Sequence, residues 1–318
     1  MLALCVESSH ARGMGHLFRA CRLARALAET GEQVRFYVND HAPSLEWLQR
    51  YGFHFSVSPV EMPDADWEAA AIARDGVRLW IYDKHFTEAR ATARIKAAGI
   101  PLVTFDDRGS GAADADLHVA ALAFDPHETL GGRVLLRGEQ YLLLDEGLAR
   151  FRRPRAAAGR PGRYIVTLGG ADTYGVTPRI MRLLARHKRP ATVVVGPAFS
   201  HFDALRAVTD GTFEVKQNVP SLAEEFDRHE VAITGGGMTP FEAAACGLPC
   251  IVVANEDFEV PVGRALAGFG GAVFAGHHAD LDESVFAREL PVGEMSRAAL
   301  QRIDLDGVRR VVEAVRSL

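Results

Sequence analysis

The sequence has little cysteine and no long apolar run. Its 318 residues include four cysteines, Cys5, Cys21, Cys246 and Cys250. These lie in apolar or helical contexts without zinc-ligand spacing, so we expect buried thiols in a reducing compartment. No apolar stretch approaches the roughly 20 residues that span a bilayer. Residues 1–6 fit a strand better than a signal peptide. We therefore expect a cytoplasmic protein without a transmembrane segment.

An excess of charge of one sign is also missing. The formal net charge is -5, with 24% charged and 48% hydrophobic residues. This balance gives no reason to expect a nucleic acid or membrane partner, and it is typical of a globular protein with a full core. The length exceeds the usual domain of about 100–200 residues, which favours two domains.

Strand-like and helix-like segments alternate along the chain. The expected strands are 2–7, 33–38, 53–57, 79–82, 102–105, 117–120, 164–168, 191–195, 213–215, 231–234, 249–254 and 272–274. Such alternation predicts parallel sheets covered by helices on both faces.

The fold class predicted is α/β, with two doubly wound, Rossmann-type domains facing a cleft. Residues 151–162 are basic and rich in Pro and Gly, so they are interpreted as a linker between domains 1–150 and 163–318. Two terminal helices around Asp306-Gly307 are expected to return toward the first domain. Ligands of such sheets bind beyond the carboxyl ends of the strands.

One glycine turn stands out as a candidate phosphate site. An apolar strand, 231–234, runs through Gly235-Gly236-Gly237-Met238 into a helix that begins at Thr239. Glycines allow close approach of a ligand, and the free N–H groups of a helix start favour a phosphate. Glu242, one turn into the helix, can accept hydrogen bonds from a ribose. The alternative is a tight strand-to-helix turn without a ligand.

A second glycine loop, Gly13-Met14-Gly15, precedes His16 and lacks the third glycine of a dinucleotide fingerprint, because Phe18 stands there. The positive end of a helix disfavours an imidazolium, so His16 is expected to be neutral and able to act as a base. The alternative is a histidine that packs at a helix start.

Further polar loops follow other predicted strands. Asp83 with His85, and the Asp106-Asp107 pair, are candidates to support a site, although turn formation and helix capping are the favoured roles for the pair. Gly169-Gly170-Ala171-Asp172 can face the same diphosphate or be an ordinary loop. His277-His278 has no nearby ligand partner in the sequence, so metal binding there is not expected.

The loop 255–259 is well placed to touch a sugar. Its acidic residues can instead complement the dipole of the helix that follows.

Together these residues resemble the UDP-2,4-diacetamido-2,4,6-trideoxy-β-L-altropyranose hydrolases of pseudaminic acid biosynthesis. The likeness spans nearly the whole chain and extends more remotely to the glycosyltransferase that adds N-acetylglucosamine in peptidoglycan assembly. It is carried by the motifs Gly13-x-Gly15-His16 with Arg19, Asp83, 105–107, Gly169-Gly170-x-Asp172, 236–242, 247–249 and 295–310.

The resemblance implies the GT-B fold and a set of site residues. His16 is implied as the catalytic base, and no metal or cofactor is implied. The implied substrate contacts are Gly13, Gly15, Arg19, Asp83, His85, Asn255, Phe258 and Glu259. The implied nucleotide contacts are Gly169, Gly170, Asp172, Gly235, Gly236, Gly237, Met238, Thr239 and Glu242. The chain departs from the family at His85, where a tyrosine is usual, and at Phe258-Glu259, where Asn-Gln is usual.

The first hypothesis for function is a hydrolase of a UDP-linked amino or deoxy sugar, in surface-glycan or nonulosonic acid biosynthesis. The alternative is a GT-B glycosyltransferase in which a sugar or glycan hydroxyl replaces water. A third hypothesis is a nucleotide-sugar binding protein without activity. The expected partner in each case is a UDP-sugar.

Overall fold

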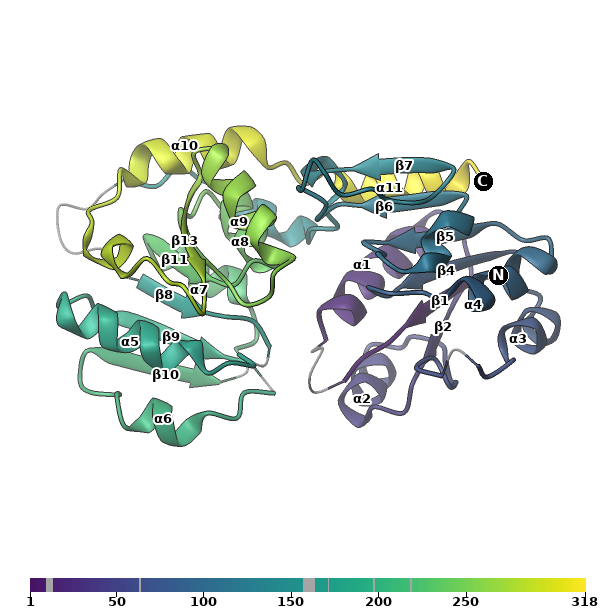
Figure 1. Cartoon of the computed structure of the whole chain (residues 1–318), viewed down its shortest axis with the longest axis horizontal. Helices are drawn as coiled ribbons and strands as arrows, with labels where there is room; N and C mark the ends of the chain where they lie inside the picture. Colours follow the sequence, from purple (N-terminus) through teal and green to yellow (C-terminus); the bar gives the residue numbers. More distant parts are fainter. Residues whose placement is uncertain (10–13, 63, 157–163, 171, 197, 218) are drawn as a thin grey trace. The chain divides into compact units, whose positions relative to one another are not determined.

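The computed structural model describes residues 1–9, 14–62, 64–156, 164–170, 172–196, 198–217 and 219–318. The chain forms two compact units, each an α/β structure around a parallel sheet (Figure 1). The first unit comprises Met1–Leu144 and Asp306–Leu318, and the second comprises Asp145–Leu305.

The first unit contains a seven-stranded sheet in the order β3-β2-β1-β4-β5-β6-β7. Its strands are β1 (Leu2–Val6), β2 (Val34–Val38), β3 (Phe55–Val57), β4 (Leu79–Asp83), β5 (Leu102–Phe105), β6 (Leu117–Ala120) and β7 (Val134–Arg137), and all neighbours are parallel. Its helices are α1 (Gly15–Glu29), α2 (Ala42–Arg50), α3 (Glu68–Asp75), α4 (Ala89–Ala97) and α11 (Gly307–Arg316), with short 3-10 turns η1 (Ser110–Asp114) and η2 (Glu139–Tyr141).

The second unit contains a six-stranded parallel sheet in the order β10-β9-β8-β11-β12-β13. Its strands are β8 (Tyr164–Thr167), β9 (Ala191–Val195), β10 (Phe213–Gln217), β11 (Val231–Thr234), β12 (Cys250–Ala254) and β13 (Ala272–His277). Its helices are α5 (Val176–Arg186), α6 (Phe202–Arg206), α7 (Leu222–Asp227), α8 (Thr239–Ala245), α9 (Glu259–Gly268) and α10 (Val292–Arg302), with η3 (Glu146–Phe151) and η4 (Glu283–Ala287).

Both sheets reverse their strand order at one place. In the first unit β2 and β3 extend to one side of β1, and β4 begins the other side; β8 and β11 form the same junction in the second unit. Open α/β sheets bind ligands outside the carboxyl ends of the strands at this junction. The loops after β1, β4, β8 and β11 are among the polar or glycine-bearing loops that the sequence analysis singled out, and the strand order places them in two pairs.

The second unit, Asp145–Leu305, begins before the predicted linker 151–162 and ends before the predicted domain end at 318. Residues 151–156 do not form a free linker: Arg152 donates to the carbonyl of Ala245 at 2.8 Å, and Arg155 is buried. These arginines bind carbonyls at the end of α8, which is a favourable place for cations. The remainder of the predicted linker, 157–162, lies outside the described residues.

The last helix returns to the first unit, where Figure 1 shows α11 beside β6 and β7. Four valines on one face of α11 are buried in the core that α1 also lines: Val308, Val311, Val312 and Val315. Only α11 returns, because α10 packs against α8 in the second unit. Strand β7 is absent from the strands predicted from the sequence; it is a half-exposed strand at the edge of the sheet.

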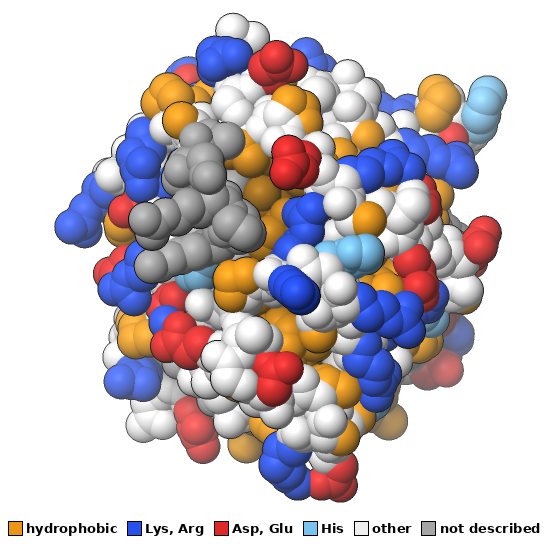
Figure 2. All heavy atoms as spheres, turned by 90° about the vertical axis from the view of Figure 1, so that its left-hand side faces the viewer, with side chains coloured by type: hydrophobic (Ala, Val, Ile, Leu, Met, Phe, Trp, Pro, Cys, Tyr) orange, Lys and Arg blue, Asp and Glu red, His pale blue; other side chains and the backbone are white. Residues whose placement is uncertain are grey.

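The face of the second unit that Figure 2 presents carries Lys, Arg, Asp and Glu side chains of both signs interspersed. Interspersed charges produce no large field of one sign on that face. Within the described residues, no helix has the length and apolar character needed to cross a membrane.

Candidate functional site

The first candidate centre surrounds the start of α1. His16 is the second residue of α1, and Asp83 is the last residue of β4, whose partner β1 ends just before the loop that leads to α1. His16 Nδ1 lies 2.6 Å from Asp83 Oδ1. A carboxylate only accepts hydrogen bonds, so Nδ1 carries the proton and Nε2 keeps its lone pair. The arrangement leaves His16 able to accept a proton at Nε2.

A buried arginine holds Asp83 in place. Arg19 donates from Nε to Asp83 Oδ2 at 3.0 Å and from Nη2 to Asp83 Oδ1 at 2.5 Å, and its Nη1 pairs with Asp106. All three side chains are nearly inaccessible, with Arg19 4% exposed. Burial raises the pKa of Asp83, but Arg19 and then His16 outweigh burial and hold that pKa well below its usual value. Asp83 is therefore ionised when it orients His16.

These contacts change the expected roles of two residues. Arg19 and Asp83 were predicted to touch substrate, but each is buried and occupied by protein partners, so they support His16 instead. The Asp106-Asp107 pair divides its roles. Asp106 binds Arg19, whereas Asp107 accepts from the backbone N–H groups of Thr87 and Gly109 as a turn former.

His85 lies against His16. The two ring centroids are 4.3 Å apart and the rings are nearly perpendicular, at 87°. Burial, and then proximity to His16 and Arg19, lowers the pKa of His85 to about 3. This imidazole is consequently neutral at physiological pH. Gly15 is the exposed first residue of α1, and Gly13 lies outside the described residues.

The second candidate centre is the turn between β11 and α8. Gly235 and Gly236 are buried, while Gly237, Met238 and Thr239 are half-buried. A Cβ on Gly236 would lie 2.6 Å from Glu259 Cβ and 3.1 Å from the Glu259 carbonyl oxygen, so a side chain is excluded there. Glu242 is half-buried in the first turn of α8, as the sequence predicted.

Glu259 ties this turn to the loop after β12. Its Oε2 accepts from the N–H of Gly236 at 3.2 Å and from that of Asn255 at 2.7 Å. Burial raises the pKa of Glu259, and the backbone hydrogen bonds oppose this shift. Asn255 places its amide 2.9 Å from the Cβ position of Gly235, and Phe258 is 38% exposed. Glu259 thus shapes the glycine turn from within the protein.

The loop after β8 contains two exposed glycines and a buried aspartate. Gly169 and Gly170 are exposed, with open space where a Cβ would lie. Asp172 is instead buried, and its two oxygens accept from the N–H groups of Val176 and Thr177, each at 2.9 Å. Asp172 therefore caps α5, and its nucleotide contact stays a prediction.

A cluster that the sequence did not indicate lies on loops after β8, β12 and β13. Tyr174 stacks on His278 with ring centroids 4.1 Å apart, and its hydroxyl donates to Glu256 at 3.1 Å. Its members are far apart in sequence, and no motif joins them. The one feature of the sequence that could have located these residues is that each follows a predicted strand.

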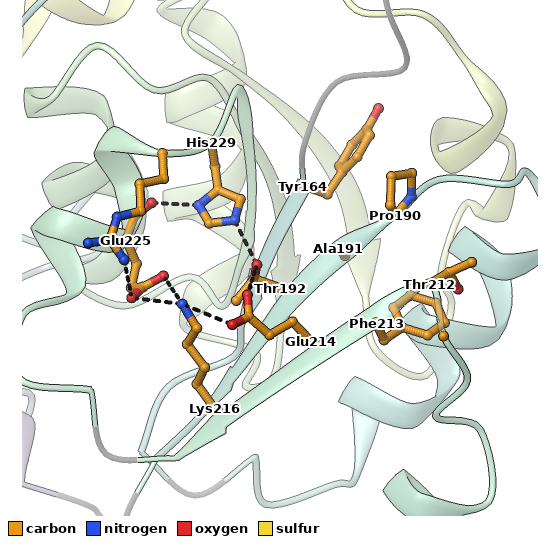
Figure 3. Close-up of a pocket in the computed structure, with 12 residues that line it drawn as sticks. Tyr164, Pro190, Ala191, Thr192, Thr212, Phe213, Glu214, Lys216, Glu225 and His229 are labelled. Atoms are coloured by element: carbon orange, nitrogen blue, oxygen red, sulfur yellow. Dashed lines mark hydrogen bonds and ion pairs between the residues drawn. The ribbon is translucent and has the colours of Figure 1, made fainter.

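The pocket in Figure 3, of about 330 Å³, lies elsewhere on the second unit, along β9 and β10. Its polar groups bind one another: His229 contacts Thr192 at 2.9 Å, and Lys216 contacts Glu225 at 2.9 Å. Thr192 and Glu214 are the second residues of their strands, far from the carboxyl ends. Within the second unit, this pocket does not include the turn between β11 and α8.

No protein-family model matches the chain. The chain is 24% identical over 281 residues to the uncharacterized protein MJ1062 of Methanocaldococcus jannaschii, a match covering 81% of this chain and 56% of that protein. It therefore spans little more than half the length of that relative. It is 22% identical over 289 residues to the spore coat polysaccharide biosynthesis protein SpsG of Bacillus subtilis, covering 86% of this chain and 83% of SpsG.

Solved structures share the architecture over the full chain. MurG of Acinetobacter baumannii has a TM-score of 0.69 and 14% identity, with 100% of this chain and 99% of MurG covered. The glycosyltransferase VinC, solved in complex with dTDP, has a TM-score of 0.62 and 15% identity, with both chains covered completely. The chain has the GT-B fold, as the sequence predicted.

Proposed function

We propose that this protein is an enzyme that uses a nucleotide-sugar, and that it transfers the sugar to an acceptor hydroxyl in the formation of a surface polysaccharide. The observation that carries an enzymatic role is the 2.6 Å contact between His16 Nδ1 and Asp83, which fixes a basic Nε2 on His16. Two similar proteins support the reaction class: SpsG, a polysaccharide biosynthesis protein, and VinC, a glycosyltransferase bound to dTDP.

The chemistry requires one proton acceptor and one site for a leaving diphosphate. His16 Nε2 takes the proton of the attacking hydroxyl, whose oxygen bonds to the anomeric carbon. The bond from that carbon to the phosphate oxygen breaks, and the nucleoside diphosphate leaves with the electron pair. We assign the diphosphate to the turn Gly235–Thr239 and the exposed Gly169-Gly170 backbone, and the ribose to Glu242.

Hydrolysis is the second candidate, because water can replace the acceptor hydroxyl at the same base. The motif resemblance to the UDP-sugar hydrolases favours it. The similarity to SpsG and to glycosyltransferase structures favours transfer. The sugar contacts assigned to Asn255, Phe258 and Glu259 belong to both candidates, as does the uracil base implied by the motifs.

The test incubates purified protein with UDP-sugars and dTDP-sugars, each with and without glycan acceptors, and measures nucleoside diphosphate release. Transfer predicts release only when an acceptor is present. Release of the nucleoside diphosphate at the same rate without an acceptor would show hydrolysis instead of transfer. A nucleotide-induced rise in melting temperature without any turnover would leave only a binding protein.

A further inference from the structure

The residue next to the proposed base offers a further inference, which rests on the proposed function. Three buried charged groups form one cluster with His16: Arg19 on α1 and Asp83 at the end of β4 contact it, and Asp106 after β5 binds Arg19. One guanidinium and two carboxylates leave one net negative charge while the imidazoles of His16 and His85 are neutral. The cluster can therefore accept one proton and become neutral, whereas a second proton would leave a buried positive charge.

Asp83 contacts His16 Nδ1 directly at 2.6 Å, so an imidazolium there is balanced by an adjacent carboxylate. Its neighbour His85 has its ring against the His16 ring at a centroid distance of 4.3 Å. The burial and surroundings of His85 keep its own pKa near 3, so it does not compete for the proton.

The ring contact also restricts motion of the base. A histidine ring turns about its side-chain bonds unless neighbours fill the space beside it. The nearly perpendicular His85 ring occupies one side of His16, and Asp83 fixes the edge that carries Nδ1. Loss of the His85 ring would open space beside His16 and allow Nδ1 to leave the carboxylate.

We propose that His85 is a positioning residue: its ring holds His16 in the rotamer and tautomer that present Nε2 as the base, and its nitrogens take no part in proton transfer. The nearby phenylalanine, Phe86, does not replace this function, because its side chain is 59% exposed and its ring centroid is 6.4 Å from that of His85. The prediction for variants is that ring shape at position 85 matters and basicity does not.

The experiment compares His85→Phe, which keeps a ring without nitrogens, with His85→Ala, which removes the ring. Nitrogen-15 NMR of the imidazoles, with His16 assigned by its absence in His16→Asn, reports the tautomer without requiring turnover. We expect the Nδ1–H form of His16 in the wild type and in His85→Phe, and a mixture of tautomers in His85→Ala. Thermal melting confirms that each variant is folded.

The kinetic arm measures kcat, KM and their pH dependence with the donor and acceptor that the wild type turns over. We expect His85→Phe to keep the wild-type kcat and the wild-type dependence of kcat on pH at the acid side of the profile. His85→Ala should lose about 10- to 100-fold in kcat, since a misplacement of about 1 Å can cost about 10²-fold. The matched control is His187→Ala, which removes an exposed imidazole at the end of α5.

A His85→Phe variant as inactive as His16→Asn would assign proton transfer to the His85 nitrogens and overturn the proposal. An unaltered His16 tautomer in His85→Ala would also overturn it. If the wild type turns over no nucleotide-sugar, the proposed function fails, while the NMR arm still decides whether His85 positions His16.

Discussion

At the scale of single residues, the contact between His16 and Asp83 leads to a prediction for the variant His16→Asn. Replacing His16 by asparagine removes the basic nitrogen but keeps a polar side chain of similar reach. We expect turnover to fall about 10²–10⁴-fold, the usual contribution of a positioned base. Nucleotide binding, measured by calorimetry, should be retained because the phosphate site is assigned to other loops. Turnover near the wild-type rate would remove His16 from the mechanism.

Asp83 makes a second prediction at this scale, which concerns stability and pH. Asp83→Asn leaves Arg19 with one carboxylate partner, and breaking a buried ion pair typically costs about 3–5 kcal/mol. The pKa of Asp83 is depressed by Arg19 and His16 against the opposing effect of burial, so its ionised form stabilises the fold above about pH 4. This stabilisation is lost as the pH falls toward the depressed pKa.

The measurement is urea unfolding of wild type and Asp83→Asn between pH 7 and pH 3. The difference in free energy of unfolding should be constant near neutral pH and shrink below about pH 4. A difference that instead grows in acid would contradict the assigned ion pair.

At the scale of elements, the turn between β11 and α8 depends on the absence of a side chain. Gly236→Ala would place a Cβ 2.6 Å from Glu259 Cβ and 3.1 Å from a backbone oxygen, which cannot move freely. Overpacking of this kind typically costs about 1–3 kcal/mol and displaces the turn. We expect a lower melting temperature and weaker binding of nucleoside diphosphates, measured by thermal shift and calorimetry.

The control for this prediction is Gly211→Ala, since nothing lies within 4 Å of a Cβ at Gly211. That variant should bind nucleotide like the wild type. Equal behaviour of the two variants would show that Glu259 does not constrain the turn.

At the scale of the whole molecule, the C-terminal helix is part of the first unit's core. Ending the chain after Leu305 removes four buried valines of α11. At about 1.5–3 kcal/mol for each side chain, their burial is worth at most roughly 6–12 kcal/mol. Total stabilities are about 5–15 kcal/mol, so the first unit should lose its fold.

Limited proteolysis with mass spectrometry tests this expectation. Peptides of 1–144 should become cleavable, whereas 164–305 should stay protected. Removal of Ser317 and Leu318 alone should change nothing, because both residues are exposed. Continued protection of the first unit without α11 would contradict its place in the core.

The sequence alone determined the parallel α/β architecture of both halves. Strands buried on both faces are nearly continuous apolar runs, so the predicted ranges 102–105, 191–195 and 231–234 coincide with β5, β9 and β11. Glycines and polar residues after those runs located the loops at the strand ends. These signals are local, and local patterns are all that a single sequence reports directly.

Only the tertiary structure decided which side chains meet. Arg19 and Asp106 are separated by 87 positions, and Glu259 and Gly236 by 23, yet each pair is in contact. The return of α11 to the first unit and the capping of α5 by Asp172 also depend on contacts between segments that are distant or not paired by any motif. The physical reason is that partners of buried charges and apolar faces are fixed by strand order and packing, which periodicity along the chain does not encode.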